Sequence, residues 1–207
     1  MPLADFPLGP LQTNSYVLHE KTKACVIDVG GDPAPILDYL HTHGLELAAI
    51  CLTHLHFDHL YGVAQLQRLT KAPVYAPKGD ALIADTEASQ GGIWGFPKVE
   101  PFASTDVPLG ETTFADLACK VLLTPGHTPG SVSYYFPDEG LLFSGDVLFY
   151  RSVGRTDFPL GSTEQLLTAI RSQLFTLPPT TRVFPGHGPE TSIADEKANN
   201  PICGDFS

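Results

Sequence analysis

The stretch LTHLHFDHLYG, residues 52–62, concentrates side chains that can bind metal ions. Within six positions it places three imidazoles and one carboxylate, those of His54, His56, Asp58 and His59. Polar groups are costly to bury unpaired, so four of them beside an apolar run need a common partner. Nitrogen and oxygen donors at this density are typical of a catalytic metal site. We therefore interpret this stretch as the first part of a metal centre.

Three later apolar runs each end in one further donor. VLLT (121–124) leads into His127, LLFS (141–144) into Asp146, and RVF (182–184) into His187, each through a turn that contains glycine. Sites in α/β sheets collect beyond the carboxyl ends of strands. Taken alone, each of these residues would be interpreted as an ordinary turn residue. Together with the first cluster, they predict that four strand ends meet at one centre.

The spacing divides the seven residues between two metal positions. Residues two apart on an extended segment face the same side, whereas the adjacent pair Asp58 and His59 projects toward a neighbouring position. The first position is assigned to His54, His56 and His127. The second position is assigned to Asp58, His59 and His187. Asp146, with two oxygens, is predicted to bridge both ions, and the shell leaves room for a shared water.

The donor set predicts two divalent ions, for which we expect zinc, while iron and manganese are also compatible. Asp58 and Asp146 are the predicted catalytic residues, because their carboxylates can orient a hydroxide formed between the ions as well as bind metal. Asp28 ends the strand ACVID. It is either a hydrogen-bond partner of a ligand or a turn residue.

Apolar runs and amphipathic stretches alternate around these motifs. The predicted strands are residues 15–20, 24–31, 47–53, 72–77, 118–124, 131–136, 141–145 and 181–188. The predicted helices are residues 33–44, 59–70, 162–178 and two shorter ones, 78–89 and 192–200, with Ser162 or Thr163 as the N-cap of the helix over 162–178. A Gly/Pro-rich segment at about 89–110 joins the N-terminal and C-terminal halves of the chain. This mixture favours an α/β fold of two sheets packed face to face with helices outside, in one domain.

The amino-acid composition limits the classes of partner that the chain is expected to bind. The 207-residue chain has 12 Lys and Arg against 23 Asp and Glu, a formal net charge of −11, which disfavours nucleic acid and anionic membranes. The N-terminus lacks the features of a secretory signal, and no apolar run could span a bilayer. Four cysteines are widely spaced; Cys25, Cys51 and Cys119, in strand-like apolar runs, predict free core thiols in a reducing compartment, and Cys203 stays unassigned. We therefore expect a cytoplasmic protein, and the oligomeric state stays open.

The motifs THLHFDH, TPGHTPGS, FSGDVLF and FPGHG, in this order, resemble those of the metallo-β-lactamase superfamily over nearly the whole chain. The resemblance implies a four-layer αββα sandwich of two mixed β-sheets with helices outside, formed by residues 1–207 as a single domain. It also implies metal binding by the same seven residues.

Within this superfamily, the sequence is most similar to the small glyoxalase II-like (hydroxyacylglutathione hydrolase-like) branch. Asp146 stands where β-lactamases tend to use cysteine, and SVGRTDFPLGS and GHGPET resemble this branch. Only residues 188–207 follow His187, so the glutathione-binding helical domain of full-length glyoxalase II is not expected. Arg155, in GRTD, aligns with a lysine that those enzymes use toward glutathione, which implies a substrate-binding role.

The predicted reaction is hydrolysis of a small-molecule thioester, such as S-lactoylglutathione or a related anionic acyl-thiol, by a metal-bound hydroxide. A thiolate leaves readily, since thiols have a pKa of about 8.5. The alternative is a persulfide dioxygenase of the same fold with one iron, in which Asp58, His59 and His187 would hold no second metal. A non-enzymatic metal-binding protein is disfavoured by the complete ligand set, and a nuclease by the net charge.

Overall fold

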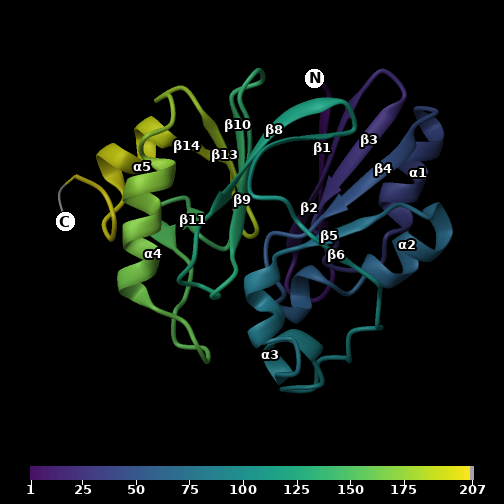
Figure 1. The fold of residues 1–207 in the computed structure, drawn as a ribbon, viewed down its shortest axis with the longest axis horizontal. Helices are drawn as coiled ribbons and strands as arrows, with labels where there is room; N and C mark the ends of the chain where they lie inside the picture. Colours follow the sequence, from purple (N-terminus) through teal and green to yellow (C-terminus); the bar gives the residue numbers. More distant parts are fainter. Residues whose placement is uncertain (206–207) are drawn as a thin grey trace.

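Two six-stranded mixed sheets lie at the centre of the computed structural model, which describes residues 1–205 (Figure 1). The first sheet has the order β1 (Leu3–Leu8), β2 (Thr13–Glu20), β3 (Lys23–Ile27), β4 (Glu46–Cys51), β5 (Val74–Ala76) and β6 (Thr105–Asp106). The second has the order β14 (Thr191–Ser192), β13 (Arg182–Pro185), β10 (Leu141–Gly145), β9 (Val132–Phe136), β8 (Leu117–Leu123) and β7 (Gly110–Phe114).

Both sheets combine parallel and antiparallel pairs. In the first, β1, β2 and β3 pair antiparallel, and β3 to β6 pair parallel. In the second, only β10 and β13 pair parallel among the described strands. A hairpin of β11 (Leu148–Phe149) and β12 (Ser152–Val153) follows β10.

Helices cover the outer faces of the two sheets (Figure 1). The first sheet is covered by α1 (Ala34–Thr42) and α2 (Val63–Thr70), and the second by α4 (Thr163–Ala169), its π-helical continuation η3 (Ile170–Leu174), and α5 (Ile193–Asn199). The short helices η1 (Phe57–His59), η2 (Lys78–Leu82) and α3 (Glu87–Gln90) occur between β4 and β6 in the chain. The predicted four-layer αββα sandwich is therefore confirmed.

Alternating side chains along the strands build three layers of core. On β2, Tyr16 and Leu18 enter the core between the sheets, and Val17 packs in the core that includes α1 and α2. On β10, Phe143 enters the core between the sheets and Leu142 the core that includes α4. A strand covered on both faces is apolar at every position, which explains the continuous apolar runs of the sequence.

All four cysteines are buried and free. Cys25, Cys51 and Cys119 lie in the core between the sheets, and Cys203 packs in the core that includes α4 and η3. The prediction of core thiols is confirmed for Cys25, Cys51 and Cys119, and the structure places Cys203, which the sequence left unassigned, in a core as well. Among residues 1–205, no helix has the length and apolar character needed to cross a membrane.

The structure differs from the predicted elements in three places. The helix expected over 59–70 begins only at Val63, because His59 and Leu60 donate to carbonyls three residues back and form the separate 3₁₀ turn η1. The helix expected over 162–178 has the predicted N-cap Ser162, but its α-helical part ends at Ala169. Strand β1 was not predicted; it is an edge strand that pairs only with β2 among the described strands.

Candidate metal centre

The loops that follow four strands bring all seven predicted residues together. His54 and His56 follow β4, and Asp58 and His59 lie on η1. The other three residues follow β8, β10 and β13 as predicted; they are His127, Asp146 and His187. Six of the seven side chains are at most 13% exposed, whereas that of His187 is 30% exposed. A buried cluster of this polarity requires internal partners.

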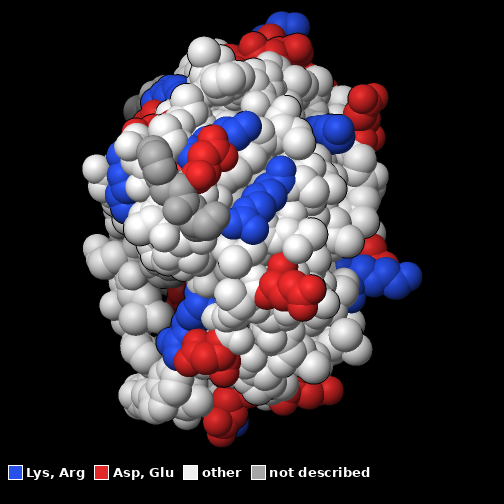
Figure 2. All heavy atoms as spheres, turned by 90° about the vertical axis from the view of Figure 1, so that its left-hand side faces the viewer, with Lys and Arg blue, Asp and Glu red and all other residues white. Residues whose placement is uncertain are grey.

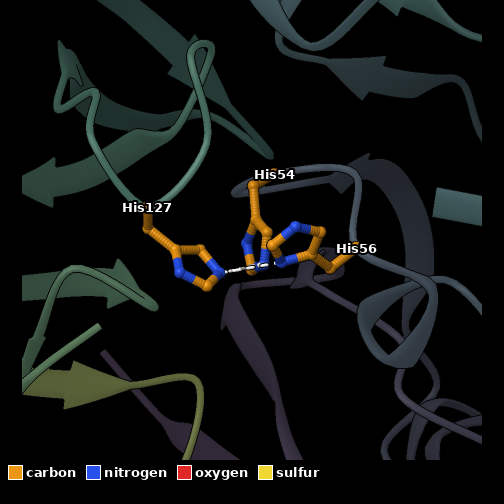
Figure 3. A group of neighbouring side chains, drawn as sticks. All are labelled: His54, His56 and His127. Carbon is orange, nitrogen blue, oxygen red and sulfur yellow. Dashed lines mark hydrogen bonds between the residues drawn. The ribbon is translucent and has the colours of Figure 1, made fainter. Parts of the chain in front are cut away.

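Three imidazoles converge on one point (Figure 3). His56 Nδ1 lies 2.8 Å from His127 Nε2, and His54 Nε2 lies 3.2 Å from the same atom. In Figure 3, His127 approaches from one side, and His54 and His56 approach from the loop on the other. One donor nitrogen from each ring lies within 4.8 Å of the others, a spacing that suits one metal ion.

A second group of donors lies beside the first. His187 Nε2 is 3.1 Å from Asp58 Oδ2, and His59 Nε2 is 3.6 Å from the same oxygen. Donor atoms of these three residues also lie within 4.8 Å of one another. These are the residues that the sequence assigned to the second position, and His54, His59 and Asp146 form a further group of donors within the same distance.

Asp146 lies between the two groups. Its Oδ1 is 3.4 Å from His59 Nε2, and its Oδ2 is 3.6 Å from His127 Nε2 and 3.7 Å from His187 Nε2. The carboxylate therefore faces donors of both groups at once. This position is the one that a bridging ligand would occupy.

Hydrogen bonds behind the rings fix which nitrogen faces the centre. His59 Nδ1 donates to Asp28 Oδ2 at 2.8 Å, and His127 Nδ1 donates to the carbonyl oxygen of Arg155 at 2.7 Å. His54 Nδ1 lies 3.0 Å from Thr53 Oγ1, which itself donates to Asp28 Oδ2 at 2.7 Å. A neutral imidazole with its proton on Nδ1 presents the lone pair of Nε2. Asp28, whose role the sequence left open, is thus a hydrogen-bond partner of the cluster.

Two buried atoms of the cluster support metal occupancy. His59 Nε2 and Asp146 Oδ1 have no hydrogen-bond partner among the described residues, although both are buried. Gly186 leaves the space beside them open, since a Cβ at this position would lie 2.3 Å from Asp146 Oδ1 and 2.7 Å from His59 Cε1. A cation between these two atoms would satisfy both. The His/Asp cluster therefore fits a pair of divalent ions.

The electrostatic environment gives most of these groups the charge that binds cations. Burial and the neighbouring His127 lower the pKa of His56 to about 3, and burial and His59 place the pKa of His54 well below its usual value. Burial raises the pKa of Asp146, but the histidines, above all His59, lower it by more. The neutral imidazoles of His54 and His56 and the ionised carboxylate of Asp146 are ready for a metal. The pKa values of His59 and His187, which burial would lower, are instead raised by the neighbouring carboxylates.

Two residues of the site were not found from the sequence. Asp80, on η2, is fully buried and accepts hydrogen bonds from Leu55 N at 2.8 Å, Gly130 N at 2.6 Å and Thr128 Oγ1 at 3.0 Å. It joins the loop of His54 and His56 to the loop of His127. Thr13, on β2, donates to Asp58 Oδ2 at 3.2 Å. Neither residue belongs to a recognisable motif, so only the contacts reveal it.

A cleft of about 470 Å³ opens over the donors. Its walls beyond the donor residues are mostly apolar and include Leu11, Phe57, Trp94, Phe96, Phe149, Val153 and Phe158. Arg155, whose carbonyl oxygen accepts the hydrogen bond from His127 Nδ1, also lines the cleft.

Comparison with known proteins decides the family. A family model described as "Metallo-beta-lactamase superfamily" matches residues 8–187. The chain belongs to the metallo-β-lactamase superfamily. Among curated members, it is 39% identical to the probable metallo-hydrolase YqgX of Bacillus subtilis, over 97% of both chains. It is 31% identical to hydroxyacylglutathione hydrolase GloC of Haemophilus influenzae, over 95% of both.

Solved structures of the superfamily superpose closely. The B3 metallo-β-lactamase BLEG-1 has a TM-score of 0.90 and 37% identity, over 98% of this chain and 99% of that one. TTHA1623 in a di-iron-bound form has a TM-score of 0.86 and 38% identity, over 96% of this chain and 98% of that one. ETHE1 from Myxococcus xanthus has a TM-score of 0.79 and 32% identity, over 98% and 85%. These relatives share the fold of this chain, and TTHA1623 holds two irons.

Proposed function

We propose that this superfamily member is a dinuclear hydrolase of thioesters, such as S-lactoylglutathione or a related anionic acyl-thiol. The observation that carries the proposal is the arrangement of two groups of three donors that share Asp146. The similarity to GloC supports this substrate class. We propose zinc as the metal, with iron as the competing choice because TTHA1623 is described in a di-iron form.

The proposed ligands are the seven residues of the cluster, in two positions. The first is His54, His56 and His127, and the second is Asp58, His59 and His187, with Asp146 shared. When bound, the ions lower the pKa of a water and polarise the substrate carbonyl. The water oxygen bonds to that carbon, the C–S bond breaks, and the thiolate leaves with the bonding electron pair.

Residues of this chain position the reacting groups. Asp58 accepts a hydrogen bond on Oδ2 from the hydroxyl of Thr13, which restrains the orientation of its carboxylate. Asp146 is fixed between the two groups by its position directly after β10. We propose that both carboxylates orient the attacking water and that Asp58 accepts its proton.

We propose that Arg155 binds an anionic part of the substrate at the edge of the cleft. Its guanidinium lies 4.2 Å from the centroid of the Phe158 ring and pairs with Asp157 through Nε and Nη2. Five N–H groups are available on a guanidinium, so the pair leaves donors for a carboxylate. We do not propose a nucleic-acid or membrane partner. Figure 2 shows acidic and basic side chains interspersed on the face of α4 and α5, and the chain is acidic overall.

We also propose a single domain and a cytoplasmic location, which the four free, buried thiols support. Two competing activities have specific support. ETHE1 is 32% identical and favours the persulfide dioxygenase alternative, for which one iron per chain would suffice. BLEG-1 is 37% identical and is a metallo-β-lactamase, so a β-lactam belongs in the substrate test even though Asp146 replaces the cysteine expected in such enzymes.

The test combines metal content with substrate choice. Purified protein is analysed for zinc, iron and manganese, and is then assayed with S-lactoylglutathione, a β-lactam and, under oxygen, glutathione persulfide. Two metals per chain with thioester hydrolysis support the proposal. One iron per chain with oxygen uptake and no hydrolysis would replace it with the dioxygenase. Turnover of the β-lactam alone would assign the protein to the lactamases.

A further inference from the structure

His187 is the proposed metal ligand whose ring is held least directly. Its side chain is 30% exposed, the largest fraction among the seven residues of the cluster. The rings of His54, His59 and His127 each have a hydrogen-bond partner on Nδ1, whereas no described residue makes a hydrogen bond to His187 Nδ1. The placement of this ring therefore depends on how the backbone on either side of His187 is fixed.

One residue of the other sheet holds that backbone. Asn14, the second residue of β2, is 8% exposed, and its Nδ2 donates to the carbonyl oxygens of Pro185 and Gly188, both at 3.0 Å. Both N–H groups of the amide are thereby used. The backbone N–H of Asn14 donates to the carbonyl oxygen of Gly186 at 2.8 Å. A single residue thus binds three carbonyl groups, two before His187 and one directly after it.

The residue before Asn14 restrains a second ligand of the same metal position. Thr13 is fully buried, and its Oγ1 donates to Asp58 Oδ2 at 3.2 Å. That oxygen lies 3.1 Å from His187 Nε2. Two adjacent residues of β2 therefore restrain Asp58 and His187, which come from segments after β4 and β13.

The first donor group is held by other segments. His54 Nδ1 lies beside the hydroxyl of Thr53, and His127 Nδ1 donates to the carbonyl oxygen of Arg155. Asp80 joins the two loops that carry these ligands. The side chains of Thr13 and Asn14 make no hydrogen bond to this group in the described part of the chain. Loss of the contacts from β2 would leave the supports of the first position in place.

We propose that Asn14 is a positioning residue that sets the occupancy of the second metal position and leaves the first unaffected. It acts through the backbone on both sides of His187 and touches neither metal nor substrate. This inference rests on the proposed two-metal site. It goes beyond that proposal because it makes the two ions separable, the second one depending on a strand that supplies no ligand.

The test counts bound metal in Asn14→Ala. The change removes the side-chain donor to Gly188 O, whereas Pro185 O keeps its hydrogen bond from the hydroxyl of Tyr16 at 2.7 Å. The variant and the unchanged protein are loaded with zinc and dialysed against graded concentrations of the chelator dipicolinate. Loss of a residue that orients a ligand weakens metal binding by about 10- to 100-fold. We therefore expect the variant to hold one zinc per chain where the unchanged protein holds two.

Tyr16→Phe is the matched control. It also removes a buried hydrogen bond to Pro185 O from β2, but it leaves the contacts of Asn14 on either side of His187. We expect this variant to hold two zincs with unchanged affinity. A loss of metal that came only from a weaker contact between the sheets would appear in both variants. Urea denaturation of the metal-free proteins compares their stabilities directly.

Cobalt provides a spectroscopic readout of the two positions. Visible absorption follows cobalt(II) as it binds, because the bands depend on the ligands and their geometry. The unchanged protein should saturate after two equivalents, and Asn14→Ala after one, with the same bands for the first equivalent. Retention of the first ion also shows that the variant is folded, since the first position takes ligands after β4 and after β8, in opposite sheets. Asn14→Asp, which keeps the side-chain volume and replaces the donor by an oxygen, should behave like Asn14→Ala and serves if the latter does not fold.

The outcomes separate this inference from the proposed function. Two ions held with unchanged affinity by the Asn14 variants would overturn the positioning role and leave the hydrolase in place, and so would loss of both ions together. Selective loss of one ion, in a protein whose unchanged form binds two metals but hydrolyses no thioester, would retain the role of Asn14 and overturn the proposed function. An unchanged protein that binds only one metal would overturn both.

Discussion

Asp28 Oδ2 accepts hydrogen bonds from both His59 Nδ1, at 2.8 Å, and Thr53 Oγ1, at 2.7 Å. The hydroxyl of Thr53 in turn lies 3.0 Å from His54 Nδ1. One carboxylate oxygen therefore orients a histidine of each donor group. Asp28 adopts a φ of 54°, a left-handed conformation that aspartate tolerates better than most residues.

Asp28→Asn is expected to weaken metal binding with little change in side-chain volume. An amide NH₂ in the place of Oδ2 would donate to His59 Nδ1, so the proton of that ring would move to Nε2 and block metal binding. Loss of such a partner weakens metal affinity by about 10- to 100-fold. Metal content after dialysis is the measurement, and fewer than two metals per chain is the expected result.

Asp32→Asn is the control for that variant, because Asp32 is exposed and caps only Ala34 N. It should retain the metal content of the unchanged protein. Two metals held equally tightly by Asp28→Asn would show that the carboxylate does not set the histidine tautomers.

Asp80→Ala should destabilise the fold and loosen the first metal position. The change leaves the N–H groups of Leu55 and Gly130 and the hydroxyl of Thr128 without their acceptor. Buried unsatisfied donors cost about 1–3 kcal/mol each, so a loss of roughly 3 kcal/mol or more in the free energy of unfolding is expected. Urea denaturation measures it, and Asp85→Ala, at an exposed position, is the control. A loss no larger than that of the control would refute the joining role of Asp80.

Arg155→Ala is expected to raise KM for anionic thioesters while kcat and metal content stay nearly unchanged. Its side chain is about half exposed and pairs with Asp157, so removing it leaves the donor cluster in place. Lowering uniform binding raises KM without changing kcat. Steady-state kinetics with S-lactoylglutathione and with a neutral thioester provide the comparison. Metal loss in this variant, or an equal effect on the neutral thioester, would contradict the role.

The thiols should be unreactive in the folded protein near neutral pH. Burial raises the pKa of Cys25 to about 12 and that of Cys203, with a further contribution from Glu196, to about 12. Unfolded thiols ionise near pH 8.5, so above that pH only the unfolded state loses these protons and stability falls as pH rises. A thiol-specific reagent at pH 8 should react slowly until urea is added, when all four cysteines react. Rapid reaction of native protein at pH 8 would contradict the burial of these groups.

The sequence alone predicted the donors and their grouping. Residues two apart on an extended chain face one side, and apolar runs that stop at His or Asp mark strand ends, so His54, His56 and their partners could be assigned by local geometry. The two-sheet fold followed from the same runs, because strands buried on both faces are apolar throughout.

Only the tertiary structure decided the roles of Asp28, Asp80 and Asn14. Asp28 and Asp80 act on residues about 25 to 50 positions away in the chain. A single carboxylate in a loop carries no local signal of the amides and rings that will surround it. Asn14 reaches carbonyl groups 171 and 174 positions away in the chain, and it does so only because the two sheets pack against each other. Contacts between distant segments arise from packing, which no local pattern encodes.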